Sequence, residues 1–128
     1  MVAPTFVYCE YIIFMSTIRF ENVVKTFPGM NYPAVGGVDL TIESGQFVVF
    51  LGPSGCGKTT LMKMVNRLHE PTSGDIYIDD HSIYDGMDVI ALRRKIGYVI
   101  QQIGLFPHMT VAENIAIVPD LLNWPKEK

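Results

Sequence analysis

A run of glycines that ends in a lysine and a threonine is the part of this sequence whose residue types and spacing could do chemistry. Residues 52–59, GPSGCGKT, have the spacing G-x-x-x-x-G-K-[ST] of a phosphate-binding loop. Glycines let successive backbone N–H groups point into such a loop without a Cβ in the way, and a following helix adds the positive end of its dipole. The sequence therefore predicts a site for nucleotide phosphates rather than a glycine-rich structural turn.

The side chains of this loop have separate expected roles. Lys58 supplies a point charge for the β and γ phosphates, and the Thr59 hydroxyl is the expected ligand of Mg²⁺. Cys56 occupies a variable position of the motif. We expect a tolerated small residue there, since no histidine lies close in sequence to activate its thiol as a nucleophile. The predicted phosphate-contacting residues are Gly52, Pro53, Ser54, Gly55, Cys56, Gly57, Lys58, Thr59 and Thr60.

A phosphate-binding loop needs a strand before it and a helix after it, and the flanking sequence predicts both. Residues 47–51, FVVFL, form an unbroken apolar run that is typical of a parallel strand covered on both faces. We therefore expect this strand at the centre of a sheet. Residues 59–68 are predicted to form a helix, because they place one apolar stripe at helical spacing: Leu61, Met64, Val65 and Leu68.

The remaining elements are predicted from alternation, turn residues and capping signals. Residues 17–23 and 35–42 read as strands of an antiparallel flanking sheet, separated by a turn-rich segment. Further strands are predicted at 75–78 and, as a buried strand, at 96–100. Helices are predicted at 88–94 and from Val111, where Thr110 and Glu113 match a capping box.

Length, charge and cysteine content limit the class of protein. The 128 residues are 48% hydrophobic, enough for one small domain or part of a larger one. A net charge of about −3 lacks the basic excess of a general nucleic-acid binder, so no nucleic-acid partner is expected. Cys9 and Cys56 are too few for a disulfide framework, which favours the cytoplasm.

The first 15 residues form an apolar extension that is too short for a membrane span and contains Glu10. We expect the folded domain to begin at residue 16 and hypothesise that translation starts at Met15. The alternative is an apolar arm that packs on a partner.

Three segments carry a resemblance to a known family: GPSGCGKTTLMKMVNRL, SGDIYIDD and IGYVIQQIGLFPHMTVAENI. From about residue 17 to 128 the chain resembles the ATP-binding subunit of an ABC transporter, and the last segment resembles importers of glycine betaine, carnitine or choline. The resemblance implies an α/β P-loop NTPase fold with a parallel core sheet and an antiparallel β flank, here as an incomplete ABC ATPase domain. Residues 16–107 would be the nucleotide-binding core and 108–128 the start of the helical subdomain.

The resemblance also implies roles for residues outside the loop. Gln101 matches the Q-loop glutamine, which contacts Mg²⁺ and the region of the attacking water, so Gln101 and Lys58 are the expected catalytic residues. Phe27 matches the aromatic residue that stacks on adenine, with Tyr32 as the competing candidate. His69 is expected to be solvated.

The expected partners follow from the same resemblance. Residues 103–108 correspond to the surface that senses the transmembrane permease subunits, where Leu105 and Phe106 are either interface anchors or plain core residues. A second ATP-binding subunit is expected for the full-length protein, which would lie peripherally on the cytoplasmic face of the cell membrane.

The sequence contains no second strand that ends in an Asp-Glu pair, no LSGGQ-type signature and no switch histidine. We therefore expect the full-length protein to hydrolyse ATP, whereas this chain by itself binds ATP and Mg²⁺ with negligible turnover. A truncated, non-catalytic nucleotide-binding module is the alternative. A small phosphate-loop kinase is disfavoured, since no arginine-rich lid segment follows the loop.

Overall fold

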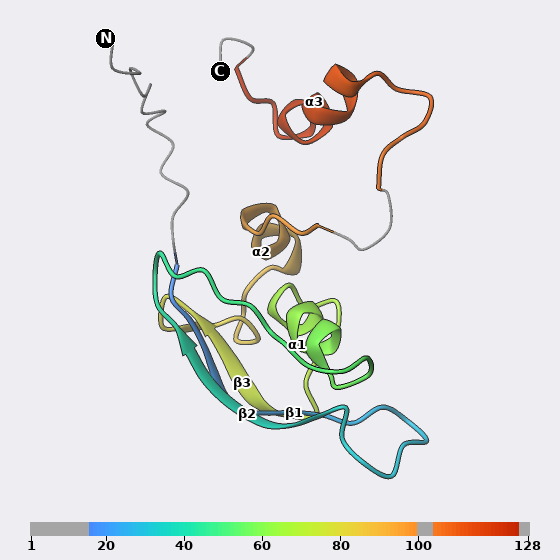
Figure 1. Ribbon diagram of the computed structural model, residues 1–128. Coiled ribbons are helices and arrows are strands. Elements are labelled where there is room, and N and C mark those ends of the chain that lie inside the picture. Colours follow the sequence, from blue (N-terminus) through green and yellow to red (C-terminus); the bar gives the residue numbers. More distant parts are fainter. Residues whose placement is uncertain (1–15, 100–103, 126–128) are drawn as a thin grey trace, which may run out of the picture. The chain divides into compact units, whose positions relative to one another are not determined.

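The computed structural model describes residues 16–99 and 104–125, and the chain divides into two units (Figure 1). One unit ends at Gly97 and the other begins at Tyr98. The first contains a sheet and two helices, and the second contains one helix. The predictions for residues 1–15 and for Gln101 lie outside the described residues.

The sheet of the first unit has four strands in the order β2-β1-β3-β4, and every neighbouring pair is antiparallel. The strands are β1 (Ile18–Lys25), β2 (Val35–Ile42), β3 (Ser73–Ile78) and β4 (His81–Ser82). Ile18 pairs with Ile42 on one side and with Ile78 on the other, so β1 is an inner strand between β2 and β3. The predicted antiparallel flanking sheet is confirmed.

The core of the first unit lies between this sheet and two helices, α1 (Lys58–Val65) and α2 (Val89–Lys95). Met64 of α1 is fully buried against Ile76 of β3 and Val23 of β1, and Leu92 is the buried residue of α2. Burying one such side chain stabilises a fold by about 1.5–3 kcal/mol. Of the apolar stripe predicted for residues 59–68, Leu61 and Met64 are therefore buried in this core and Val65 is partly buried, whereas Leu68 is 47% exposed. The helix itself ends at Val65, three residues earlier than predicted.

Helix α1 ends early because the chain reverses into a left-handed turn. Arg67 has φ 54, and its amide donates to the Met64 carbonyl at 3.0 Å. The guanidinium of Arg93, from α2, then donates to the carbonyls of Asn66 at 3.0 Å and Arg67 at 2.7 Å. A cation thus satisfies carbonyl groups at the negative end of α1.

The predicted parallel core sheet is not formed by the described residues, and this expectation is corrected. Residues 47–51 and 96–99 are not strands, and Phe47, Leu51 and Val99 are about 92, 89 and 92% exposed. A parallel strand exists only where neighbouring strands supply its hydrogen bonds and other elements cover its faces. Within residues 16–99 and 104–125 no strand pairs with either segment. Most of the apolar side chains of residues 47–51 are exposed, while Phe50 and Ile96 are partly buried against the core.

The second unit contains α3 (Val111–Leu121). Thr110 caps its start: the Thr110 hydroxyl accepts from the Glu113 amide at 3.2 Å, and the Glu113 carboxylate accepts from the Thr110 amide at 2.7 Å. The predicted capping box is confirmed. Among the described residues, no helix has both the length and the apolar character that crossing a membrane requires.

Candidate phosphate-binding site

The glycine-rich loop runs directly into α1, which begins at Lys58. No side chain caps this helix, and its first turn contains no acidic residue. The Leu61 amide donates a backbone hydrogen bond to the Gly57 carbonyl at 2.8 Å, which joins the loop to the first turn of the helix. The positive end of an uncapped helix is a favourable place for an anion. The predicted link between loop and helix is therefore present.

The side chain of Lys58 folds back across the loop. Its ammonium donates to the carbonyl oxygens of Gly52 at 2.7 Å and Pro53 at 2.8 Å, and it lies 3.3 Å from the Cys56 sulfur. Backbone carbonyls are weaker partners for a cation than charged oxygens are. The lysine is thus held in the loop by bonds that an incoming phosphate group could replace.

The glycines of the loop are required by space as well as by backbone angles. A Cβ at Gly52 would lie 2.8 Å from the Cys56 sulfur, and one at Gly57 would overlap the Ala34 carbonyl oxygen. Gly55 has φ 83 and Gly57 has φ 93, the left-handed region that glycine adopts most easily. A side chain is therefore excluded at Gly57 by the Ala34 backbone and is disfavoured at Gly52 and Gly55 by their backbone angles.

The chemistry of the loop fits Mg²⁺ bound together with a phosphate ligand. Thr59 lies in the first turn of α1 with an exposed side chain, and Thr60 follows it. Within residues 16–99 and 104–125 no three His, Cys, Asp or Glu side chains come together as a metal site. Mg²⁺ is commonly held by few protein oxygens together with substrate phosphates, and a hydroxyl beside a phosphate cradle suits that mode.

The two aromatic candidates for adenine stacking lie in the segment between β1 and β2. The ring of Phe27 is half-buried and meets the His69 ring edge-on, with centroids 5.4 Å apart and planes at 83°. The Lys25 ammonium lies 5.1 Å from the Phe27 ring centroid. Tyr32 is 65% exposed. The Phe27 ring is thus in contact with two neighbouring side chains, whereas Tyr32 lies on the surface.

The sequence analysis did not predict the environment of His69. It was expected to be solvated, but its ring is half-buried on Phe27. Burial, followed by the positive charges of Lys63 and Lys25, lowers the pKa of His69 below its ordinary value of 6.5. The turn signals after α1 indicated an exposed position, and nothing local in the sequence marked the contact with a ring 42 positions earlier.

In the second unit, Leu105 and Phe106 are 65 and 47% exposed, so neither is a core residue of the part that is described. Asn114 fixes the turn they lie on: its side-chain amide donates to the Phe106 carbonyl at 3.2 Å, and its oxygen accepts from the Phe106 amide at 2.8 Å. Asn114 is thus a positioning residue that the sequence analysis did not single out.

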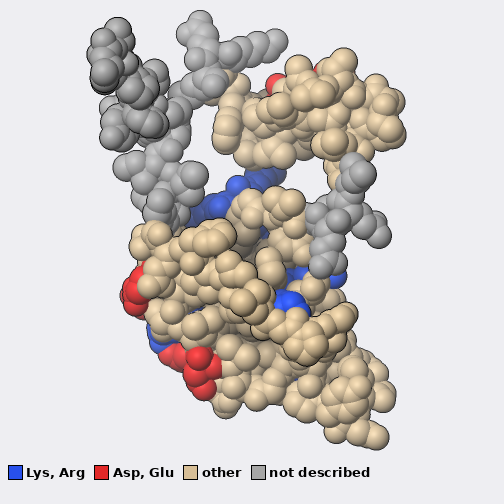
Figure 2. All heavy atoms as spheres, viewed as in Figure 1, with Lys and Arg blue, Asp and Glu red and all other residues tan. Residues whose placement is uncertain are grey.

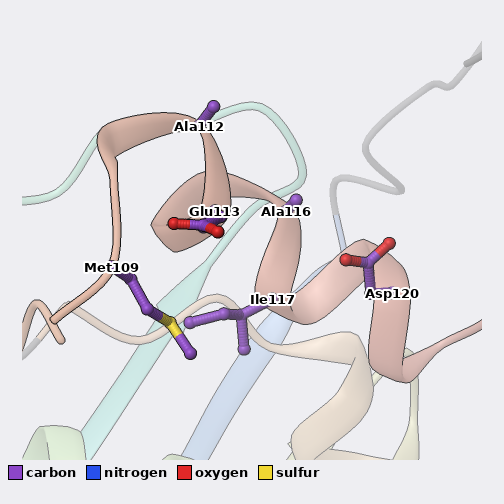
Figure 3. Close-up of a pocket in the computed structure, with 6 residues that line it drawn as sticks. All are labelled: Met109, Ala112, Glu113, Ala116, Ile117 and Asp120. Carbon is purple, nitrogen blue, oxygen red and sulfur yellow. The ribbon is translucent and has the colours of Figure 1, made fainter.

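Helix α3 also borders a pocket of about 360 Å³, with an apolar floor and two carboxylates (Figure 3). Its lining residues are Met109, Ala112, Glu113, Ala116, Ile117 and Asp120. At the lower left of Figure 2, basic and acidic side chains lie next to one another.

Comparisons with known proteins show the family of this chain. Residues 35–128 match the family described as ABC transporter. The chain is 59% identical over 111 residues to the glycine betaine/carnitine/choline transport ATP-binding protein OpuCA of Bacillus subtilis, and equally to the choline transport ATP-binding protein OpuBA of that organism. It is 53% identical over 114 residues to the osmoprotectant import ATP-binding protein OsmV of Salmonella typhimurium.

These alignments cover 87% of this chain and 29, 29 and 30% of the three relatives, so the chain spans less than a third of the length of the curated relatives it matches. Among solved structures, the dimeric post-hydrolysis state of the ATP-binding cassette MJ0796, bound to ADP and Pi, superposes with a TM-score of 0.71 at 37% identity. That match covers 81% of this chain and 47% of that one. The expected P-loop NTPase fold class is confirmed by this likeness.

The family match includes the whole glycine-rich loop, α1 and the segments quoted from the sequence, and the resemblance to quaternary-amine transport proteins is confirmed by the identities above. A phosphate-binding loop at the start of α1, a similar solved fold and a family match over residues 35–128 converge on one conclusion: this chain belongs to the ABC transporter family.

Proposed function

We propose that this chain is the ATP-contacting front part of the energy-coupling subunit of an importer for glycine betaine, carnitine or choline. The observation that carries the proposal is the loop at residues 52–59, with Lys58 held across it. The solute class is supported by the names of relatives at 59% identity, which are transport ATP-binding proteins for these compounds.

In this proposal the loop binds the phosphates of ATP. The backbone N–H groups at the start of α1 donate to phosphate oxygens, and Lys58 exchanges its bonds to Gly52 and Pro53 for bonds to the β and γ phosphates. The Thr59 hydroxyl would be one protein ligand of Mg²⁺, and the bound ion would supply neutralisation of the phosphate charge. The contacts with phosphate extend from Gly52 through Thr60.

Phe27 is proposed to receive the adenine ring. Its ring is already oriented by His69 and Lys25, whereas Tyr32 remains the alternative on the same segment. Stacking on an aromatic ring contributes roughly 1–3 kcal/mol per base. Gln101, outside the described residues, is proposed as a Mg²⁺ ligand and catalytic residue of the full-length protein.

The proposed partners are transmembrane permease subunits and a second ATP-binding subunit. Exposed Leu105 and Phe106, on a turn fixed by Asn114, are suited to anchor a permease segment. Such a subunit would lie on the cytoplasmic face of the cell membrane. Leu105→Asp and Phe106→Asp should reduce co-purification with the permease, while Leu68→Asp, at an exposed site in the first unit, should not.

Binding of Mg-ATP to the purified chain, measured by calorimetry, tests the nucleotide site. Lys58→Ala should weaken binding roughly 10- to 150-fold, the loss expected from about 1.5–3 kcal/mol for hydrogen bonds to a charged group. Lys95→Ala, a lysine of α2, is the matched control and should leave the affinity unchanged. Equal affinities for the wild type and Lys58→Ala would rule out the proposed phosphate site.

A second proposal is that the chain alone binds ATP without hydrolysing it. General phosphoryl transfer needs a positioned water as well as charge neutralisation, and the loop supplies the second of these. Phosphate release from Mg-ATP should therefore stay at background level. Turnover by the purified chain that Lys58→Ala abolishes would overturn this proposal and leave the binding proposal intact.

A further inference from the structure

Residues 69–72, which follow α1, are joined to the end of β1 by several hydrogen bonds. The Lys25 ammonium donates to the Glu70 carbonyl at 2.6 Å, and the Thr26 amide donates to the Thr72 hydroxyl at 2.9 Å. The Thr72 amide in turn donates to the Val24 carbonyl at 2.7 Å. These bonds connect residues that are more than 40 positions apart in the sequence. Residues 69–72 are therefore held beside the end of β1.

The rings of His69 and Phe27 contact each other where these two segments lie together. The His69 amide donates to the Lys63 carbonyl at 3.2 Å, so the backbone of His69 is held at the last turn of α1. From there the imidazole contacts the Phe27 ring edge-on at 5.4 Å, while the Lys25 ammonium lies 5.1 Å from the ring centroid. An edge-on aromatic contact and a cation over a ring each have a preferred geometry, so together they restrict how the Phe27 ring can turn.

We infer that His69 is a positioning residue for the nucleotide base: it holds the Phe27 ring in the orientation that stacking on adenine requires, without touching the nucleotide itself. The inference rests on the proposed function, in which Phe27 is the adenine platform. Helix α1 then carries both ends of the site, since Lys58 begins the helix and His69 is hydrogen-bonded to its last turn.

The charges around His69 make this contact depend on pH. The groups that face it are Lys25 from β1 and Lys63 from α1, while the neighbouring Glu70 carboxylate accepts from Arg67 at 3.1 Å. A neutral imidazole packs on a phenyl ring at little cost. Protonation places a third positive charge beside two ammonium groups and favours leaving the half-buried position. Acidification should therefore loosen the Phe27 ring.

Two ligands separate an effect on the base from an effect on the phosphates: Mg-ATP and Mg-tripolyphosphate, which has no base. With the full chain at pH 7.5, His69→Ala should weaken ATP binding roughly 2- to 12-fold, the loss expected for one aromatic pair, and leave tripolyphosphate binding unchanged. His69→Phe keeps a ring at the contact and should restore ATP affinity. ATP affinity of the wild type should fall below pH 6.5, and that of His69→Phe should fall less.

Phe27→Ala distinguishes failure of this inference from failure of the proposed function. If Phe27→Ala leaves ATP affinity unchanged, Phe27 does not stack on the base. The proposed role of Phe27 and the inferred role of His69 are then both wrong. If Phe27→Ala weakens ATP binding but His69→Ala does not, the platform stands and the role of His69 is wrong. Equal weakening of ATP and tripolyphosphate by His69→Ala would show a general effect on folding and would also overturn the inference.

Discussion

Gly57 lies so close to the carbonyl oxygen of Ala34 that a Cβ on the glycine would overlap it. Gly57 is the N-cap of α1, and Ala34 immediately precedes β2. The Ala34 amide donates to the Lys25 carbonyl at 2.7 Å, which ties this contact to the end of β1. The phosphate-binding loop is therefore fixed by contact with the antiparallel sheet, even though the strand predicted before it is not formed.

Gly57→Ala should destabilise the chain more than Gly55→Ala does. Both glycines have left-handed backbone angles, and a residue with a Cβ in that region costs roughly 1–2 kcal/mol. Among the described residues, no atom outside the neighbours of Gly55 lies within 4 Å of a Cβ at that position, so this backbone cost is the one expected there. At Gly57 the overlap with Ala34 adds to it. Urea unfolding of the two variants measures the difference, and equal free energies of unfolding would contradict the close contact.

Alkylation of Cys56 should block nucleotide binding. Cys56 is a free, exposed cysteine whose sulfur lies 3.3 Å from the Lys58 ammonium and close to Gly52. A maleimide adduct there would fill the loop, so Mg-ATP should slow the labelling and labelled protein should bind ATP at least roughly tenfold more weakly. The experiment uses a Cys9→Ser background, with Cys56→Ser as the unreactive control. Labelling at the same rate with and without Mg-ATP would count against the site.

Arg93→Ala should lower the free energy of unfolding by about 1–3 kcal/mol. The guanidinium of Arg93 donates to the carbonyls of Asn66 and Arg67, and its loss leaves those carbonyls unsatisfied beside the buried Asn66 side chain. Arg94→Ala, at the exposed neighbouring position of α2, is the matched control and should change stability by less than about 0.5 kcal/mol. Similar losses in both variants would argue against the cap on α1.

The start of α3 should depend on pH through Glu113. Hydrogen bonds from the backbone and hydroxyl of Thr110 lower the pKa of Glu113 below its ordinary value of 4.5. A lowered folded-state pKa means that this stabilisation is present above pH 4.5 and is lost as the pH falls through the folded-state value. An NMR titration of the Glu113 side chain should give a lower midpoint in the wild type than in Thr110→Ala. Identical midpoints would disprove the pairing.

Features that depend on neighbours in sequence were predictable. The loop spacing, the helix after it, the antiparallel strands and the capping box of Thr110 with Glu113 all follow from patterns within about ten residues. Such patterns decide local backbone angles and hydrogen bonds, and these change little with the rest of the fold. The sequence therefore predicted the phosphate-binding loop and carried the resemblance to an ABC transporter subunit.

Contacts between distant segments were decided by tertiary structure. The apolar run at residues 47–51 predicts a parallel strand, yet a strand exists only if other strands bond to it, and no described strand does. The contact of His69 with Phe27, the Arg93 cap on α1 and the fit of Gly57 against Ala34 join residues 23 to 42 positions apart. Their existence depends on how α1 packs on the sheet, which no short stretch of sequence encodes. Residue types and spacing thus predict a site for phosphate, while packing determines what holds the loop and the Phe27 ring in place.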